Sequence, residues 1–229
     1  MPLQRLVFLF LLLVTISACD KPKPKQEDLP QQEIIIDQRK ASLPNTEQTQ
    51  PEITQSSFNP FYIYADKGSR ENHFVPSGFM PNGKCLKLDA AWKDECYQGK
   101  TCIRVDYDIE CSRTDQEWAG IYWLNPANNW GRLKGGFNLN GAAKLTFWAK
   151  GKNGGEQIQE FTIGGIEGDY PDSDKIIMGP VILSNQWKKY TVDLRGKDLS
   201  YISGGFAWST GVDVNSETCV FYLDEIRYE

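Results

Sequence analysis

The sequence of 229 residues contains a single histidine, His73, and no two cysteines in the C-x-x-C spacing. A Ser-His or Cys-His catalytic arrangement needs a histidine beside a nucleophile, and the residues around His73 contain no nucleophile motif. Structural zinc sites use several Cys or His ligands at short spacing. The sequence therefore gives little support to triad-type hydrolysis or to zinc binding.

The chain also lacks an excess of basic charge. It has 25 Lys and Arg against 30 Asp and Glu, which gives a net charge of -5. Proteins that bind nucleic acid neutralise phosphates with a basic patch or stripe, and anionic lipid surfaces attract polybasic segments. We therefore expect no nucleic-acid partner and no electrostatic attachment to a membrane.

Long hydrophobic runs are absent except for one near the start, from Leu6 to Ile16, which follows Arg5. A positive residue, a short apolar run and small residues before a cut site are typical of a secretory signal, and this run is too short to span a bilayer. The segment Ile16-Ser17-Ala18-Cys19 resembles the lipobox of bacterial lipoproteins. That resemblance implies cleavage before Cys19 and a diacylglycerol thioether on its sulfur, whereas the alternative is an ordinary secretory signal with a coincidental cysteine.

These features predict three parts: a lipoprotein signal peptide over 1–18, a disordered linker over 19–57 and a folded domain over 58–229. The linker is rich in Lys, Pro, Gln and Glu and has no aromatic residue from Asp20 to Ser57, so it cannot bury enough apolar surface to fold. We expect the domain to be exported and held at the cell envelope by its lipid anchor. The sequence leaves open whether the inner or the outer membrane holds it.

Five cysteines remain after Cys19, an odd number, so at least one thiol cannot pair within the chain. Exported proteins meet an oxidising environment in which disulfides form. Cys96 and Cys102 flank a turn-like loop, and we expect a disulfide between them.

The domain has the pattern of a β protein. Apolar residues alternate with polar ones over 103–109, 145–150 and 189–194, and Gly-Gly and Asn-Gly pairs separate such runs. No amphipathic pattern of helical length is present. About nine short strands with glycine-rich turns predict an all-β fold, an antiparallel β-sandwich.

Several motifs in order along the domain resemble the galactose-binding-like jelly rolls, including the carbohydrate-binding modules of families 4 and 11. The motifs are Asn72–Gly78, Trp118–Trp123, Asn129–Gly131, Leu145–Gly151, Gly154–Glu156 and Phe221–Ile226. The resemblance implies a jelly roll, a sugar site on the concave sheet or at one edge, and often a structural calcium. Asp224 matches the aspartate of the final-strand motif, and Asp66 is its expected partner for Ca²⁺. Solvated or salt-bridged carboxylates are the alternative for both.

Aromatic rings can stack on the apolar faces of sugars, and amides and carboxylates can bind the hydroxyl groups. The candidate carbohydrate-binding residues are Trp118, Tyr122, Trp123, Trp130, Trp148, Asn128, Asn129 and Glu156. Tyr122 and Trp123 are expected on opposite faces of one strand, and Trp130 is expected in an accessible loop. Trp148 is expected on the wetter face of its strand, together with Thr146 and Lys150. The alternative for each ring is a place in the core.

The leading hypothesis is a membrane-anchored, non-catalytic lipoprotein that binds a polysaccharide or oligosaccharide. A second hypothesis is a module that binds another envelope protein. A third is a glycan-degrading enzyme, which would need two carboxyl groups facing each other across a cleft; the compact E-x-D-x-x-E run is absent.

Overall fold

The structure is a computed structural model that describes residues 58–81 and 83–229. The predicted signal peptide, the lipidation site Cys19 and the linker lie outside the described residues. Within the described part, no helix is long and apolar enough to cross a membrane.

One sheet has six strands, all paired antiparallel. Five follow one another in the order β11 (Lys188–Asp193), β6 (Lys144–Gly151), β13 (Cys219–Tyr228), β4 (Cys102–Tyr107) and β3 (Leu86–Trp92). The sixth, β1 (Phe61–Tyr64), pairs with the C-terminal half of β13. The last strand of the chain is therefore central to this sheet.

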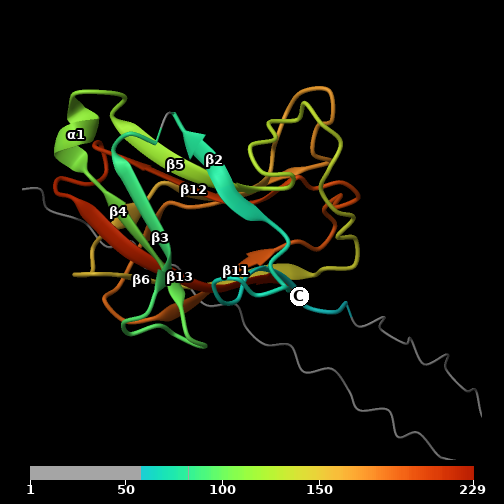
Figure 1. Cartoon of the computed structure of the whole chain (residues 1–229), viewed down its shortest axis with the longest axis horizontal. Coiled ribbons are helices and arrows are strands. Elements are labelled where there is room, and N and C mark those ends of the chain that lie inside the picture. The colour runs from blue at the N-terminus through green and yellow to red at the C-terminus, as the bar shows by residue number, and fades with distance from the viewer. Residues whose placement is uncertain (1–57, 82) are drawn as a thin grey trace, which may run out of the picture. The chain divides into compact units, whose positions relative to one another are not determined.

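The second sheet has five strands, also antiparallel. Their order is β2 (Val75–Met80), β5 (Trp118–Leu124), β12 (Gly204–Gly211), β8 (Glu160–Gly164) and β9 (Lys175–Met178). A short pair, β7 (Gln157–Ile158) and β10 (Val181–Ile182), stands beside the two sheets. Figure 1 shows β2, β5 and β12 as one layer over the layer that contains β6, β13 and β4.

The core fills the space between the two sheets. Alternate residues of each strand point into it, as Ile103 and Val105 do from β4 and Phe206 and Trp208 do from β12. Phe147 of β6 packs against Phe161 and Phe206 of the opposite sheet at ring-centroid distances of 4.6 and 5.2 Å. The prediction of an all-β antiparallel sandwich is confirmed.

The three runs chosen by alternation all form strands, but the first ends sooner than predicted. In the structure β4 ends at Tyr107, and a short helix, α1 (Ile109–Arg113), begins at Ile109. The carboxylate of Asp108 accepts a hydrogen bond from the Cys111 backbone N–H, which satisfies one of the free donors at the helix start. A helix of five residues is too short to show an amphipathic period, so the sequence pattern did not indicate it.

Two disulfides link domain cysteines. Cys96 bonds to Cys102, which confirms the predicted pair, and Cys85 bonds to Cys111, which was not predicted. The second disulfide ties the loop before β3 to α1. Cys219 is left as a buried free thiol, and burial, with the nearby charge of Glu156, raises its pKa to about 12.

Candidate functional site

The predicted binding residues fall in three separate places. Those in and after β5 lie on or near the outer side of the five-stranded sheet, apart from Trp123, which lies in the core. Trp148 lies on the outer side of the other sheet, and Glu156 lies in the turn before β7. No single site unites all eight residues, so each place is described in turn.

The outer side of the five-stranded sheet carries a small apolar cluster, separate from the main core. Ala119, Ile121 and Trp123 of β5 belong to the main core, whereas Tyr122 and Leu124 pack with Ile166 and Ala207 in the second cluster. Successive side chains of a strand point to opposite faces. The second cluster therefore lies on the solvent side of this sheet.

Trp130 lies against this cluster. Its ring contacts Tyr122 edge to face, with ring centroids 5.8 Å apart, and 39% of its surface is exposed. The close approach depends on Gly78 of β2, because a Cβ atom there would lie 3.0 Å from Trp130 Cζ2 and 2.8 Å from Tyr122 Cβ. We call Trp118, Tyr122, Trp130 and the sheet surface around Gly78 the Trp130 face.

The loop that carries Trp130 is held by its own side chains. The Asn129 side-chain oxygen accepts hydrogen bonds from the backbone N–H groups of Arg132 and Leu133, and its amide donates to the Leu133 carbonyl at 2.7 Å. Asn129 is buried and acts as a turn residue, so the predicted contact with sugar hydroxyls is not open to it. Asn128 is exposed, and its backbone N–H donates to the Ser77 hydroxyl at 2.9 Å.

A carboxylate fastens the neighbouring loop. Asp172 accepts hydrogen bonds from the backbone N–H groups of Ile166, Ser203 and Gly204 and from the Ser203 hydroxyl. Through these bonds the 165–172 loop is fixed to the start of β12. The Tyr170 N–H in turn donates to the Gly131 carbonyl at 2.9 Å, beside Trp130. The rim of the Trp130 face is thus built from two loops joined to each other.

The Tyr122 phenol marks the polar end of the Trp130 face. Its hydroxyl donates to the Gly164 carbonyl at 3.1 Å. Burial raises the pKa of Tyr122, and the negative charges of Asp172 and Glu160 add to the effect. The phenol therefore stays protonated at neutral pH, in surroundings that are acidic and that favour ligands with hydrogen-bond donors.

The two tryptophans of β5 lie on opposite faces of the strand, so one is buried and the other is exposed. Trp123 is fully buried in the core and stacks edge to face on Phe206 at 5.5 Å. Its prediction as a carbohydrate-binding residue is corrected, because its ring cannot reach a ligand. Trp118, at the start of β5, is 39% exposed and remains available at the far end of the Trp130 face.

Trp148 lies on a surface that is less open than its strand pattern indicated. The sequence placed it on a wet face with Thr146 and Lys150, yet both of those residues are buried. The loop closed by the Cys96–Cys102 disulfide covers this side of β6. Tyr97 stacks flat on Trp148 at 3.6 Å, and Glu95 pairs with the Lys150 ammonium group at 2.8 Å. One face of the Trp148 ring is thus already occupied.

Glu156 belongs neither to the Trp130 face nor to the surface around Trp148. It lines a pocket between the 153–157 turn and the 214–219 loop. Its Oε1 accepts a hydrogen bond from the Asn153 backbone N–H at 2.8 Å. Its Oε2 is buried and has no hydrogen-bond partner among the described residues. Glu156 is therefore in no position to contribute to the Trp130 face.

The two predicted calcium ligands meet the same loop. Asp66 Oδ1 accepts hydrogen bonds from the backbone N–H groups of Lys100 and Thr101, at 2.8 and 2.7 Å, and from the Thr101 hydroxyl. Asp224 Oδ2 accepts the Gln98 backbone N–H at 3.0 Å. Both carboxylates therefore anchor the Cys96–Cys102 loop to the sheet.

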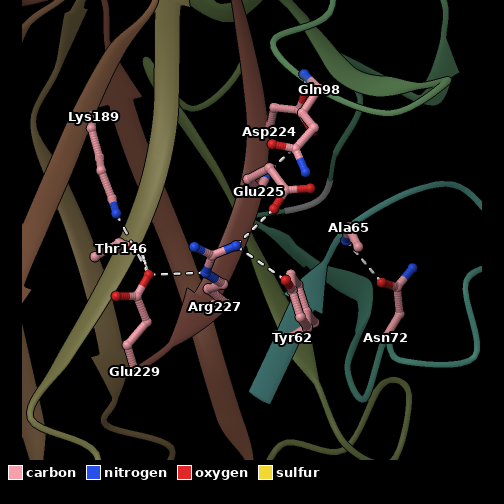
Figure 2. Close-up of polar contacts among 10 residues, drawn as sticks. All are labelled: Tyr62, Ala65, Asn72, Gln98, Thr146, Lys189, Asp224, Glu225, Arg227 and Glu229. Carbon is pink, nitrogen blue, oxygen red and sulfur yellow. Dashed lines mark hydrogen bonds and ion pairs between the residues drawn. The ribbon is translucent and has the colours of Figure 1, made fainter. Parts of the chain in front are cut away.

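Figure 2 shows Gln98 beside Asp224 and, next along β13, the ion pairs of Arg227. Arg227 donates to Glu225 at 3.0 Å, to the Tyr62 hydroxyl at 3.0 Å and to Glu229 at 2.9 Å. Asp224 itself has no cationic partner in the part of the chain that the structure describes, and burial raises its pKa to about 7. Asp224 therefore keeps its proton to a higher pH than an ordinary aspartate does.

This arrangement does not fit a calcium site. Calcium needs six to eight oxygen ligands, but the groups that face Asp66 and Asp224 are mainly N–H donors. In residues 58–81 and 83–229 no group of three or more His, Cys, Asp or Glu side chains is placed to hold a metal ion. The hydrogen bonds to the loop take the place that a cation would fill.

Three contributors to these surfaces were not predicted. Met80 and Ile166 line the cluster under Trp130, and Tyr97 covers Trp148. Met80 lies in an edge strand whose segment begins with Val-Pro and includes Gly, so it shows no clear alternation. Ile166 and Tyr97 are loop residues, and no local sequence period places a loop on a sheet.

No protein-family model matches the chain, and no curated protein matches it. Among solved structures, it is similar to a family 30 carbohydrate-binding module of a cellulosomal cellulase of Clostridium thermocellum. The sequence identity is 16%, the match covers 75% of this chain and 97% of that chain, and the TM-score is 0.47.

A family 11 carbohydrate-binding module of another cellulosomal cellulase of the same organism matches at 14% identity. It covers 76% of this chain and 95% of that chain, with a TM-score of 0.47. A family 29 module matches at 11% identity, over 74% and 87% of the two chains, with a TM-score of 0.43. These are likenesses of architecture, and no ligand of this chain follows from them.

Proposed function

We propose that the folded domain binds a polysaccharide or oligosaccharide on the Trp130 face, without catalysis. The observation that carries the proposal is the half-open Trp130 ring, which is 39% exposed and held edge to face on Tyr122 by two linked loops. An aromatic ring fixed in this way loses little conformational entropy when a sugar stacks on it. Trp118, with the same exposure on the same sheet, gives a second stacking position.

Polar groups at the margin of the Trp130 face complete the proposed site. Asn128 is exposed beside Trp130, and Glu160 of β8 is partly exposed on the acidic side of Tyr122. Amide and carboxylate oxygens accept hydrogen bonds from sugar hydroxyls. The proposed site therefore combines stacking with hydrogen bonding and assigns no residue to bond cleavage.

The proposal includes the location of the protein. We propose that Cys19 carries the lipid and that the exported domain is tethered by residues 19–57 to a membrane of the cell envelope. Two or three acyl chains anchor stably, because each buried methylene contributes about 0.8 kcal/mol. Labelling cells with a fatty-acid analogue tests this part: the wild-type chain should take up label and the Cys19→Ser chain should not.

Native gel electrophoresis in the presence of soluble polysaccharides tests the binding. The full chain, purified in detergent, should be retarded by at least one neutral polysaccharide in a panel of plant, fungal and bacterial glycans. Folded protein that is retarded by none of them, with no binding on an oligosaccharide array, would overturn the proposal.

One observation favours a protein partner as a second candidate. The edge strands of the five-stranded sheet expose large apolar side chains: Val75 at 47% and Phe79 at 38% on β2, and Ile177 at 52% on β9. Edge strands also present unpaired backbone groups that another chain can use. Recovery of one stoichiometric partner from envelope extracts, lost in a Phe79→Asp chain, would support this candidate over glycan binding.

A further inference from the structure

The outer side of the six-stranded sheet carries a group of aromatic rings around one lysine. Ring contacts join Tyr97 to Trp148, Tyr97 to Trp187 and Trp187 to Tyr222, with centroids 3.6, 6.3 and 6.5 Å apart. The residues come from β6, β13, the loop between β3 and β4, and the turn before β11. We call these four rings, together with Lys150 of β6, the Lys150 cluster.

The ammonium group of Lys150 lies between two of these rings. Its Nζ atom is 5.4 Å from the ring centroid of Trp187 and 5.1 Å from that of Tyr222, distances at which a ring attracts a cation. An ammonium has three N–H donors. In the described part of the chain its one hydrogen-bond acceptor is the Glu95 carboxylate, at 2.8 Å. Two donors are therefore left for a further acceptor.

Glu95 is an unusual partner for an ammonium so enclosed. The Lys150 side chain is 9% exposed, whereas that of Glu95 is 83% exposed. Because a carboxylate that is itself in solvent touches Nζ, the ammonium lies just beneath the surface. The backbone of Glu95 has a φ of +54°, in the left-handed region that disfavours a residue with a side chain.

The position of the loop does not depend on this ion pair. The Trp187 indole N–H donates to the Glu95 backbone carbonyl at 2.8 Å, and the next residue, Cys96, is joined to Cys102. An ion pair with a partner so exposed is weak. The Glu95 carboxylate can thus turn into solvent while the loop stays on the sheet, and this movement opens the Lys150 ammonium to an outside anion.

An exposed ring lies beside the ion pair. Tyr97 is 40% exposed, and one face of its ring is fixed on Trp148. Trp148 and Lys150 are two residues apart on β6, about 7 Å along the strand, and alternate residues of a strand point to the same face. A sugar ring can stack on the tyrosine and direct a carboxylate toward the ammonium.

We propose that the Lys150 cluster is a second binding site, for a sugar that carries a carboxylate, such as a uronic acid residue. In the free protein Glu95 occupies the place of this carboxylate. In the complex the carboxylate of the sugar replaces Glu95 at the Lys150 ammonium, accepts its spare donors as well, and the sugar ring stacks on Tyr97. The site is on the opposite sheet from the Trp130 face and does not depend on the function proposed there.

Isothermal titration calorimetry on the full chain in detergent tests the proposal, with glucuronic acid, glucose and acetate as probes. At about pH 6 both acids are ionised, whereas the neighbouring Asp224, with a pKa of about 7, mostly keeps its proton. Glucuronic acid should bind at least about threefold more tightly than glucose, which lacks the charge, and than acetate, which lacks the ring. Equal affinity for glucuronic acid and either of the other probes would overturn the proposal.

Glu95→Gln tests whether Glu95 occupies the site. The change removes the competing carboxylate, so glucuronic acid should bind about two- to fivefold more tightly than to the wild-type chain. Asp94→Asn is the matched control, because it removes the same charge from the adjacent exposed residue, and it should leave the affinity unchanged. An equal gain in both variants, or no heat from glucuronic acid with Glu95→Gln, would overturn the proposal.

Further variants locate the site. Lys150→Gln should remove the preference for glucuronic acid over glucose, while Lys197→Gln, at an exposed position after β11, should keep it. If Lys150→Gln does not fold, Tyr97→Ala at the surface should lower the affinity for glucuronic acid to that for acetate. An unchanged affinity in Tyr97→Ala would overturn the proposal.

The two proposals fail separately. Retardation by a neutral polysaccharide should be the same in Lys150→Gln as in the wild-type chain, and Trp130→Ala should bind glucuronic acid as the wild-type chain does. Loss of neutral-polysaccharide binding in Lys150→Gln would show that the Lys150 cluster belongs to the glycan site, and would overturn its assignment as a second site.

Discussion

Opening the Cys96–Cys102 disulfide should loosen the cover over Trp148 while leaving the sandwich folded. In the chain-entropy relation, a cross-link with a sequence separation of 6 stabilises by about 2.2 kcal/mol, and one with a separation of 26 by about 3.5 kcal/mol. For a domain of this size, each kcal/mol moves Tm by about 2–4 °C. Replacing Cys96 and Cys102 with Ser should therefore lower Tm by about 4–9 °C.

The matched control is the other disulfide. Replacing Cys85 and Cys111 with Ser should lower Tm by more, because that link closes a longer loop. Only the Cys96/Cys102 variant should expose Trp148, because Tyr97, which covers the Trp148 ring, lies inside that loop, and Glu95, which pairs with Lys150, directly precedes it. Iodide quenching of tryptophan fluorescence measures the exposure. Equal Tm losses with no rise in quenching would refute the view that the disulfide holds the loop on the sheet.

Three further predictions follow from the site. Trp130→Ala should weaken polysaccharide binding by about two- to thirteenfold, because it removes one stacking contact of about 0.5–1.5 kcal/mol. Leu133→Ala is the control: Leu133 lies in the same loop and is 62% exposed, and its loss should leave the affinity unchanged. Because burial raises the pKa of Asp224 to about 7, the native state keeps a proton that the unfolded state loses above about pH 4. The free energy of unfolding, relative to that of Asp224→Asn, should therefore fall as pH rises from about 4 to about 7, by at most about 1.4 kcal/mol per pH unit. A difference between the two chains that stays constant with pH in urea unfolding would contradict this. Millimolar calcium or a chelator should change Tm by less than about 1 °C. If the native domain did bind calcium, a concentration of 100 times Kd would add about 2.7 kcal/mol of stability, and such a large rise in Tm would restore Asp66 and Asp224 as ligands.

The strand pattern could be predicted because it rests on a local period. Alternation marked β4, β6 and β11, and it placed Tyr122 and Trp123 on opposite sides of β5, as found. Alternation says which residues share a face but not what covers that face. For this reason Trp148 was expected on a wet surface, although a loop some fifty positions earlier lies across it.

The parts of the site that depend on loops could not be predicted. Asn129, beside Trp130, carries a side-chain amide of the kind that binds sugar hydroxyls, but this amide forms hydrogen bonds within its own turn. Asp224 matched a calcium motif, yet the loop held by Cys96 and Cys102 brings N–H donors to it. In both cases the partner of the polar group is fixed by tertiary contacts, which no spacing in the sequence reveals.

The measurement that bears most directly on the central claim compares the two faces of the sandwich. Trp130 and Tyr97 are 39% and 40% exposed, on opposite sheets, so their alanine variants form a matched pair. In affinity electrophoresis against a polysaccharide that retards the wild-type chain, Trp130→Ala should be retarded less than the wild-type chain, and Tyr97→Ala should be retarded as much as the wild-type chain. Equal retardation of both variants, or loss in Tyr97→Ala alone, would contradict binding on the Trp130 face.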